Sequence, residues 1–217
     1  MNPNYNFKNF KFSSHNLLIK LVEPRTNVLD IGCSTGFLAL KLKQKGCKVA
    51  GVDNNKRDLV KAKKYCDKTI FLDITKDAPI GKYDVLILGD IIEHLPNPEK
   101  VLRNLKRNLK RRGYILISVP NGANIYSRIK ILLGNFDYEE KGIFDKTHLR
   151  FFTLKSFKGL IRKSGYSVKH LDYSPIPLYL AFPKAPKKLL SICNILFNML
   201  SKLRPQLFAY QFVAKIK

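Results

Sequence analysis

The fold is decided by the stretch VLDIGCSTGFL, which runs from Val28 to Leu38. Its first residues form a short apolar run typical of a buried strand, and the residues from Phe37 to Lys43 have the pattern of a helix. Gly32 and Gly36 lie in the turn between them, where glycine lets the backbone approach a ligand and the first helical N–H groups point toward it. The stretch predicts a nucleotide-like binding site in an α/β protein, although a tight turn without a ligand fits the same residues.

The spacing Asp30-x-Gly32-x-Ser34-x-Gly36 resembles motif I of the class I S-adenosylmethionine (SAM)-dependent methyltransferases, D-x-G-x-G-x-G. It differs from the G-x-G-x-x-G of dinucleotide sites. The resemblance implies that this loop, including Cys33, binds SAM. Ser34 replaces the middle glycine of the motif, so a positive φ at this position would be strained.

An acidic residue ends the second expected strand, Lys48–Val52. Asp53 lies 21 residues after Gly32, a spacing at which a carboxylate at a strand tip can accept hydrogen bonds from ribose hydroxyls. The resemblance implies the same role for Asp53, with Asn54 beside it in the cofactor site. The alternative is that Asp53 is the N-cap of the helical stretch that follows, through Tyr65.

The third expected strand, Thr69–Leu72, is followed by Asp73 and Ile74. The resemblance implies that the carboxylate of Asp73 lies near the adenine amino group and that Ile74 packs on the ring. A turn-forming aspartate is an equally good interpretation.

The fourth expected strand, Tyr83–Leu88, leads into the sequence GDIIEHLPNP. This segment closely resembles the "EHL" stretch in the small-molecule branch of these enzymes, which includes the ubiquinone-biosynthesis methyltransferases. The resemblance implies that Gly89 and Asp90 approach the cofactor, with Glu93 and His94 one turn further along the chain.

A long irregular segment from Gly134 to Phe152 ends in the pattern D-x-x-H-x-x-x-F-T, from Asp145 to Thr153, which is similar to one in the same branch. We expect it to form part of the substrate lid. Asp145 and His148 could share a proton, so His148 and His94 are candidates for the catalytic base. His148 could instead be a buried hydrogen-bonding residue that fixes the loop.

Base-methylating enzymes of this class carry either an Asn/Asp-Pro-Pro-aromatic motif after the fourth strand or a nucleophilic cysteine. Residues 89–92 read Gly-Asp-Ile-Ile, and none of the four cysteines lies at such a place. Both routes of nucleic-acid base methylation are therefore disfavoured. The cysteines also lack zinc-site spacing, so no metal site is expected, and they indicate reduced thiols of an intracellular protein.

The formal charge of +24 on 217 residues attracts polyanions such as RNA, anionic lipid or phosphorylated substrates, although solvated lysines explain it equally well. We find no signal-peptide pattern at the N-terminus and no stretch long and apolar enough to span a bilayer, so a cytoplasmic protein is expected.

An insertion over residues 174–206 begins Pro-rich and continues into a very apolar segment, Lys187–Leu203. Plain packing, a lid over the substrate and contact with a second subunit are all compatible with it. It could also lie peripherally on an anionic membrane through residues 184–204, with basic residues on the headgroups: Lys184, Lys187, Lys188, Lys202 and Arg204.

The resemblance implies an α/β, Rossmann-like fold: a seven-stranded, mostly parallel sheet with helices on both faces and an antiparallel last strand. We expect one domain over 1–217, with an extension at 1–26, a core at 27–173, the insertion at 174–206 and the last strand at 207–217. Further helices are expected at His15–Val22, Pro98–Lys110, Tyr126–Leu133 and Leu154–Ser164, and strands at Asn27–Ile31, Tyr114–Val119, Gly165–Tyr173 and Leu207–Ile216.

The implied activity is SN2 transfer of a methyl group from SAM to a small-molecule, lipid-like or glycan acceptor, on oxygen. An RNA methyltransferase is the second hypothesis, motivated by charge alone. A non-catalytic SAM-binding or membrane-associated scaffold is the third, motivated by Ser34 and the apolar insertion.

Overall fold

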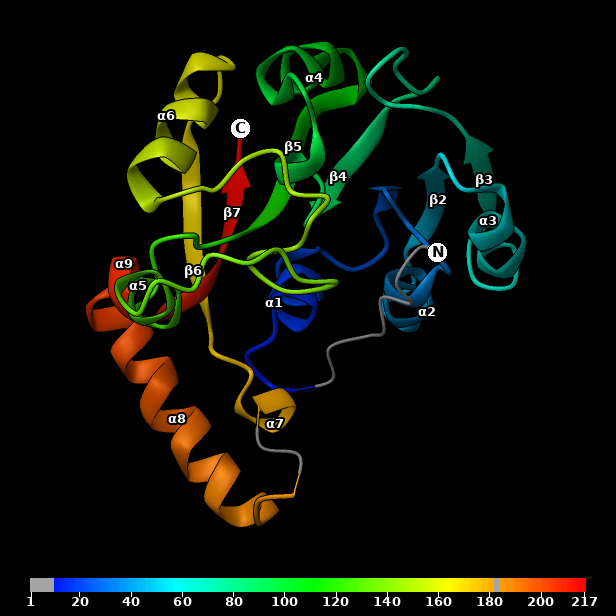
Figure 1. Cartoon of the computed structure of the whole chain (residues 1–217). Helices are drawn as coiled ribbons and strands as arrows, with labels where there is room; N and C mark the ends of the chain where they lie inside the picture. The colour runs from blue at the N-terminus through cyan, green and yellow to red at the C-terminus, as the bar shows by residue number, and fades with distance from the viewer. Residues whose placement is uncertain (1–9, 182–183) are drawn as a thin grey trace.

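A single sheet of seven strands forms the centre of the computed structural model, which describes residues 10–181 and 184–217 (Figure 1). The strand order is β3-β2-β1-β4-β5-β7-β6, in which β1 to β5 run parallel and β7 is antiparallel to both of its neighbours. This confirms the predicted fold, including the antiparallel last strand. The strands are β1 (Asn27–Ile31), β2 (Lys48–Asp53), β3 (Lys68–Phe71), β4 (Tyr83–Gly89), β5 (Leu109–Pro120), β6 (Val168–Pro175) and β7 (Ala209–Ile216).

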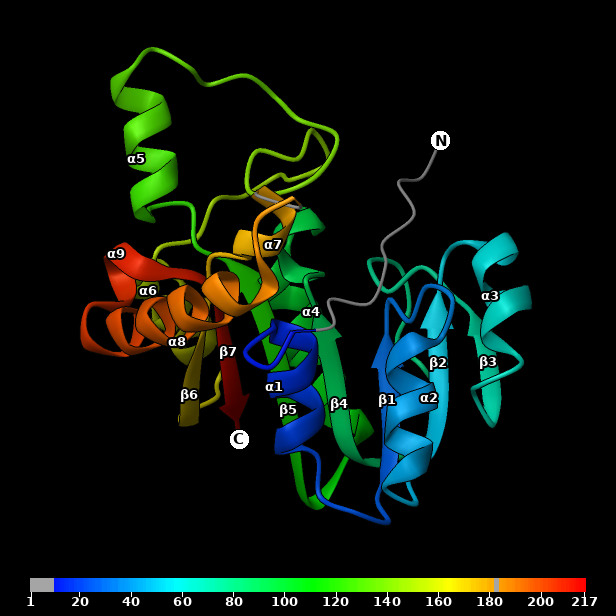
Figure 2. The same cartoon turned by 90° about the horizontal axis from the view of Figure 1, so that it is seen from below.

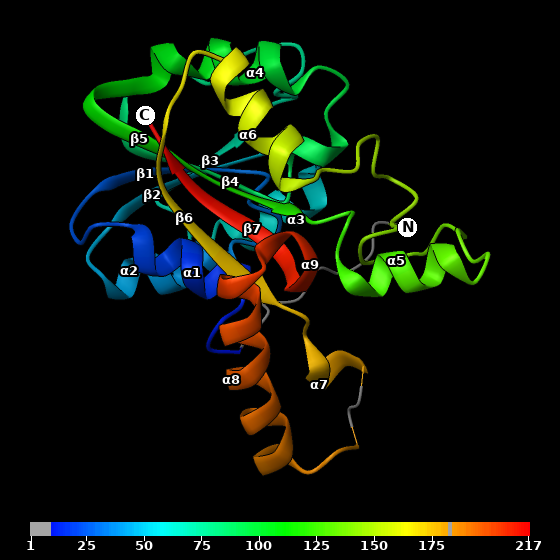
Figure 3. The same cartoon turned by 90° about the vertical axis from the view of Figure 1, so that its left-hand side faces the viewer.

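The central strands read as continuous apolar runs because helices cover both of their faces. On one face, α1 (Ser14–Leu21), α2 (Phe37–Gln44) and α3 (Lys56–Ala62) pack through residues such as Leu18 and Leu42. On the other face, α4 (Pro98–Leu105) and α6 (Leu154–Lys163) pack through residues such as Leu102 and Phe157. Figure 3 shows these two helical layers with the sheet between them.

Local capping explains two helix starts. Thr153 caps α6 as predicted, and it forms a reciprocal capping box with Ser156. The N-cap of α3 is Asn55, whose side chain accepts from the N–H groups of Arg57 and Asp58. The interpretation of Asp53 as that N-cap is therefore wrong.

The boundary between α4 and β5 differs from the prediction. The helix ends at Leu105, a 3-10 turn (η2) covers Lys106–Asn108, and β5 already begins at Leu109 instead of Tyr114. The side chain of Asn108 donates to the carbonyl of Gly81 at 3.0 Å, and Leu109 pairs with Tyr83 across a bulge. These contacts, distant in sequence, convert the end of the apparent amphipathic helix into a strand.

The remaining elements lie at the carboxyl end of the sheet. They are η1 (Ile92–His94), α5 (Ile125–Leu132), α7 (Leu178–Ala181), α8 (Lys187–Leu203) and α9 (Pro205–Phe208). Figure 2 shows α8 and α9 beside the beginning of β7, with α5 standing apart from them. Within the described residues, no helix combines the length and apolar character needed to cross a membrane. Residues 1–9 of the expected N-terminal extension lie outside the described residues, and the division of 1–217 into parts stays a prediction.

Candidate active site

The turn between β1 and α2 is strained where the motif departs from glycine. Gly32, Ser34 and Gly36 all have positive φ values, of 72°, 46° and 81°. A Cβ on Gly32 would lie 2.1 Å from Cδ1 of Ile91, so only glycine fits there without a shift of that side chain. Ser34 therefore carries the strain expected from the sequence.

Backbone hydrogen bonds bind this loop to the end of β2. The N–H groups of Gly32 and Cys33 donate to the carbonyl of Val52, and the N–H of Ser34 donates to Oδ2 of Asp53 at 2.8 Å. The Cys33 side chain is buried and would lie 2.7 Å from a Cβ on Gly51, so any cofactor contact from Cys33 would come from its backbone.

Asp53 organises the tip of β2. Its Oδ1 accepts from the N–H of Asn55 at 2.9 Å while its Oδ2 accepts from Ser34. Burial raises the pKa of this carboxyl, opposed by these backbone hydrogen bonds. Asn54, which follows, is exposed. A ribose contact from Asp53 stays a prediction.

Asp30 is a buried carboxylate at the end of β1. It is 2% exposed, and its Oδ2 has no hydrogen-bond partner among the described residues. Burial, and then the charge of Asp53, raise its pKa to about 7. A buried carboxylate beside a glycine loop suits a ligand that carries positive charge at this position, as SAM does in its sulfonium and amino groups.

We predict that Asp30 makes the ligand-free protein less stable as the pH rises. The pKa is about 7 in the folded state and 3.8 unfolded, so the folded state holds an extra proton between these values. The free energy of unfolding should fall by roughly 4 kcal/mol across that window. Urea unfolding of Asp30→Asn should lack this fall and show a variant more stable than wild type at pH 8, by about 1–3 kcal/mol.

The control for this prediction is Asp67→Asn. The carboxylate of Asp67 accepts from the N–H of Val49 at 2.7 Å and lies 3.2 Å from Nζ of Lys43. This variant should be less stable than wild type at pH 8, because it weakens both contacts. Parallel stability curves for wild type and Asp30→Asn would contradict the role given to Asp30.

Asp73 forms a turn after β3. Its Oδ1 accepts from the N–H of Thr75 at 3.0 Å and from the hydroxyl of Thr75 at 2.7 Å, as the turn interpretation predicts. Ile74 packs partly against the core. Contacts of these two residues with adenine stay a prediction.

Asp90 lies just beyond β4 and is held by side chains of β5 and β7, contacts that sequence reasoning missed. The hydroxyl of Ser118 on β5 donates to Oδ1 of Asp90 at 2.5 Å, and Nε2 of Gln211 on β7 donates to Oδ2 at 2.7 Å. Asp90 also has a positive φ of 56°. Gly89, Asp90 and their partners thus form a fixed polar floor between β4, β5 and β7.

The segment after β4 meets the irregular segment before α6. The N–H of Leu149 donates to the carbonyl of Glu93 at 2.9 Å, and the rings of His94 and His148 lie 4.7 Å apart. The two histidines, 54 residues apart in sequence, therefore share one place at the carboxyl edge of the sheet.

The ring of His148 is oriented by a backbone group. Its Nδ1 lies 2.9 Å from the carbonyl oxygen of Ile143, which can only accept, so Nδ1 carries the proton and Nε2 keeps its lone pair. Burial lowers the pKa of His148, and the neighbouring His94 lowers it further. His148 is therefore neutral at neutral pH.

A proton shared between His148 and Asp145 stays a prediction, because Nδ1 of His148 meets the carbonyl of Ile143 instead of Asp145. Oδ1 of Asp145 accepts from the N–H of Thr147 at 2.8 Å and from the Thr147 hydroxyl at 2.6 Å. The same hydroxyl lies 3.1 Å from Nδ1 of His94. Asp145 thus shapes the turn that carries both histidines.

Three side chains of this group could also hold a cation, although the sequence suggested no metal site. Glu93, His94 and His148 each offer one ligand atom, and these atoms lie within 4.8 Å of one another.

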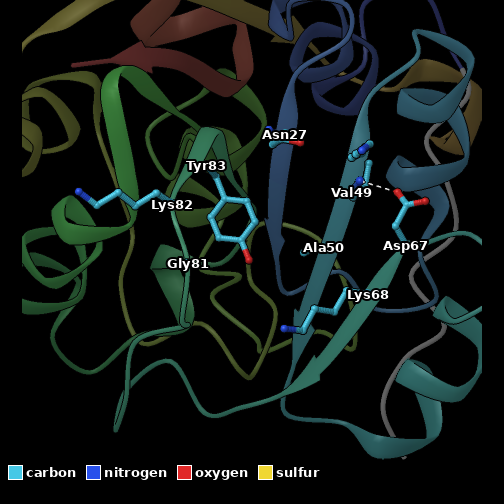
Figure 4. Close-up of a pocket in the computed structure, with 9 residues that line it drawn as sticks. Asn27, Val49, Ala50, Asp67, Lys68, Gly81, Lys82 and Tyr83 are labelled. Atoms are coloured by element: carbon cyan, nitrogen blue, oxygen red, sulfur yellow. Dashed lines mark hydrogen bonds between the residues drawn. The ribbon is translucent and has the colours of Figure 1, made fainter.

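A hollow at the opposite edge of the sheet is separate from this site. Its lining includes the first residues of four strands, which are Asn27, Lys48, Lys68 and Tyr83. Figure 4 shows Asn27, Lys68 and Tyr83 around it. Ligands of parallel α/β sheets bind beyond the carboxyl ends of the strands, where Asp30, Asp53 and Asp90 lie.

The fold and this site together define a class, the Rossmann-like SAM-dependent methyltransferases. A family model described as methyltransferase domain matches residues 8–171, and the chain belongs to this family. The resemblance noted in the sequence is therefore confirmed, with SAM as the cofactor.

Relatives with curated functions include ubiquinone biosynthesis O-methyltransferases. That of Shewanella halifaxensis is 30% identical over 49% of this chain and 48% of its own length. That of Escherichia coli is 28% identical over 69% of this chain and 67% of its own length. The chain thus spans about half the length of the first of these relatives.

Solved structures show the same fold. A SAM-dependent methyltransferase from Archaeoglobus fulgidus is 21% identical with a TM-score of 0.61, and 95% of each chain is covered. A Haloferax volcanii methyltransferase in complex with the activator Trm112 is 17% identical with a TM-score of 0.64, covering 94% of this chain and 87% of its own. At these identities the likeness concerns the fold alone.

Proposed function

We propose that the protein transfers the methyl group of SAM to a hydroxyl oxygen of a small, partly apolar acceptor, with His148 as the base. The observation that carries the proposal is the neutral imidazole of His148, whose Nδ1 is held by Ile143 and whose Nε2 keeps its lone pair. The O-methyltransferase relatives support an oxygen acceptor.

SAM supplies an already activated methyl group, so the chain mainly has to align the acceptor and exclude water. The glycine loop, Asp30 and Asp53 would hold SAM, and the floor built on Asp90 would limit how deeply the acceptor can enter. The proton of the acceptor hydroxyl would pass to Nε2 of His148 as its oxygen is methylated.

An aromatic group beside His148 supports a partly apolar acceptor. Phe144 and Phe151 lie 6.0 Å apart, Phe136 lies 5.1 Å from Phe144, and Phe151 lies 6.4 Å from His148, measured between ring centroids. Phe136 and Phe151 remain 48% and 39% exposed. Partly exposed rings next to a base suit a phenol or catechol that bears an apolar tail.

A second candidate acceptor is RNA, favoured by the formal charge of +24. Phosphate contacts would make RNA binding fall steeply with salt, whereas binding of a neutral phenol would not. Titrating a short RNA against the protein at rising salt would measure this difference.

The experiment that tests the proposal supplies methyl-labelled SAM together with a catechol, its dimethoxy analogue, an aniline or RNA. We expect label in the catechol product and none in the dimethoxy analogue, which has no hydroxyl to methylate. Label only in RNA would support the RNA methyltransferase instead. No transfer to any acceptor by a protein that binds SAM would favour a non-catalytic scaffold.

A further inference from the structure

Helix α8 exposes a row of large apolar side chains on one side, while two of its polar side chains are buried on the other. Asn198 and Ser201 are buried, 9% and 0% exposed, where the helix packs beside β6 and α9. Six large apolar side chains on the other side are 52–75% exposed: Leu189, Ile192, Ile195, Leu196, Met199 and Leu203. A surface helix of a globular protein normally has the reverse arrangement. The helix packs on the body through its other side. The exposed apolar face, which we call the outer stripe, has no partner among the described residues.

The outer stripe is wider than a coiled-coil seam. Leu189, Ile192, Leu196, Met199 and Leu203 alternate in steps of three and four, as seam positions do. Ile195 widens the stripe to about a third of the helix circumference, at about 100° per residue. This width fits a helix lying in the interface of a bilayer better than one paired with a single helix.

Charge distinguishes two possible partners of the outer stripe, a second copy of the chain and an anionic lipid surface. Lys184, Lys188, Lys202 and Arg204 are exposed at the two ends of α8, while the side chain of Lys187 is outside those described. The sequence from Tyr173 to Lys217 contains no Asp or Glu. A second copy would bring lysine against lysine, whereas an anionic lipid surface complements both the stripe and these cations.

The helix projects from the edge of the sheet that carries the candidate site. The insertion follows β6 and leads into β7 beside the carboxyl end of β5. Asn121, just after β5, holds the end of the insertion, because its Nδ2 donates to the carbonyls of Gln206 and Ala209 at 3.1 and 2.8 Å. Figures 1 and 3 show α8 extending away from the sheet. A membrane under the stripe would lie on the side from which an apolar acceptor could approach.

We propose that α8 docks the protein peripherally on an anionic membrane surface, with the outer stripe at the level of the headgroups and upper acyl chains. The docking is separate from methyl transfer, so a protein that fails to dock could still bind SAM.

The test is flotation with vesicles of phosphatidylcholine alone or mixed with phosphatidylglycerol. Wild type should float with the mixed vesicles and much less with phosphatidylcholine alone. Ile192→Glu with Met199→Glu should lower binding at least about tenfold, because charge enters the apolar interface. The matched control, Val60→Glu with Ile80→Glu, replaces side chains that are 67% and 88% exposed on α3 and the β3–β4 loop.

The control pair makes the same charge change away from α8 and should leave binding within about twofold of wild type. Wild type remaining in the soluble fraction, or an equal loss in both pairs, would overturn the proposal. So would a lipid-free oligomer of wild type that only Ile192→Glu with Met199→Glu dissociates, since the stripe would then be a contact between copies. Circular dichroism and SAM binding verify that each variant is folded.

Discussion

Replacing Gly32 with alanine should weaken SAM binding by about 10- to 100-fold. The new Cβ would lie 2.1 Å from Cδ1 of Ile91, and the φ of 72° is costly for any L side chain. The loop would have to leave the path fixed by its hydrogen bond to Val52. Isothermal titration calorimetry with SAM measures the loss.

Two further variants distinguish an effect of the loop's geometry on SAM affinity from a general loss of stability. Gly159→Ala lies within α6, where a Cβ meets nothing within 4 Å, so it should bind SAM like wild type and gain about 0.5–1 kcal/mol of stability. Adding Ile91→Ala to Gly32→Ala should restore part of the affinity, because it removes the clash and leaves the strain. Equal affinities of wild type and Gly32→Ala would show that this loop does not hold SAM.

Replacing His148 with asparagine should lower turnover by about 10²- to 10⁴-fold while SAM binding changes little. Asparagine can still donate to the carbonyl of Ile143, which His148 contacts at 2.9 Å, but it has no basic nitrogen. The variant therefore distinguishes a base from a residue that only fixes the loop. Turnover is measured with the acceptor identified by label transfer.

His170→Asn is the matched control, since His170 lies on β6 with its side chain 49% exposed, and its turnover should equal that of wild type. His94→Asn tests the other candidate. A large loss in His94→Asn with full activity in His148→Asn would assign the base to His94. Full activity in both variants would show that neither histidine acts as a general base.

Local sequence was sufficient where one short segment determines its own structure. The apolar run before Gly32, and the glycines after it, predict a strand and a turn because the pattern that indicates them lies within one short segment. Thr153 caps α6 for the same reason, since the capping box with Ser156 closes within one turn. The seven-stranded, mostly parallel sheet with an antiparallel last strand followed from the family resemblance and is confirmed.

The remaining features depend on contacts between distant residues. Ser118 and Gln211 hold Asp90 from 28 and 121 residues away, and their only signal in the sequence is a polar side chain within an apolar strand. Leu109 pairs with Tyr83 instead of extending α4. The direction in which α8 faces was also undetermined, because apolar residues cover more than half of its circumference and periodicity does not choose the buried side.

The central claim is that the ends of β1 and β2 hold SAM. Calorimetry of the wild-type protein with SAM, and with its demethylated product, tests this most directly. We predict binding of one molecule per chain for both compounds, and weaker SAM binding for Asp30→Asn. Absence of binding by either compound to folded protein at millimolar concentration would contradict the claim.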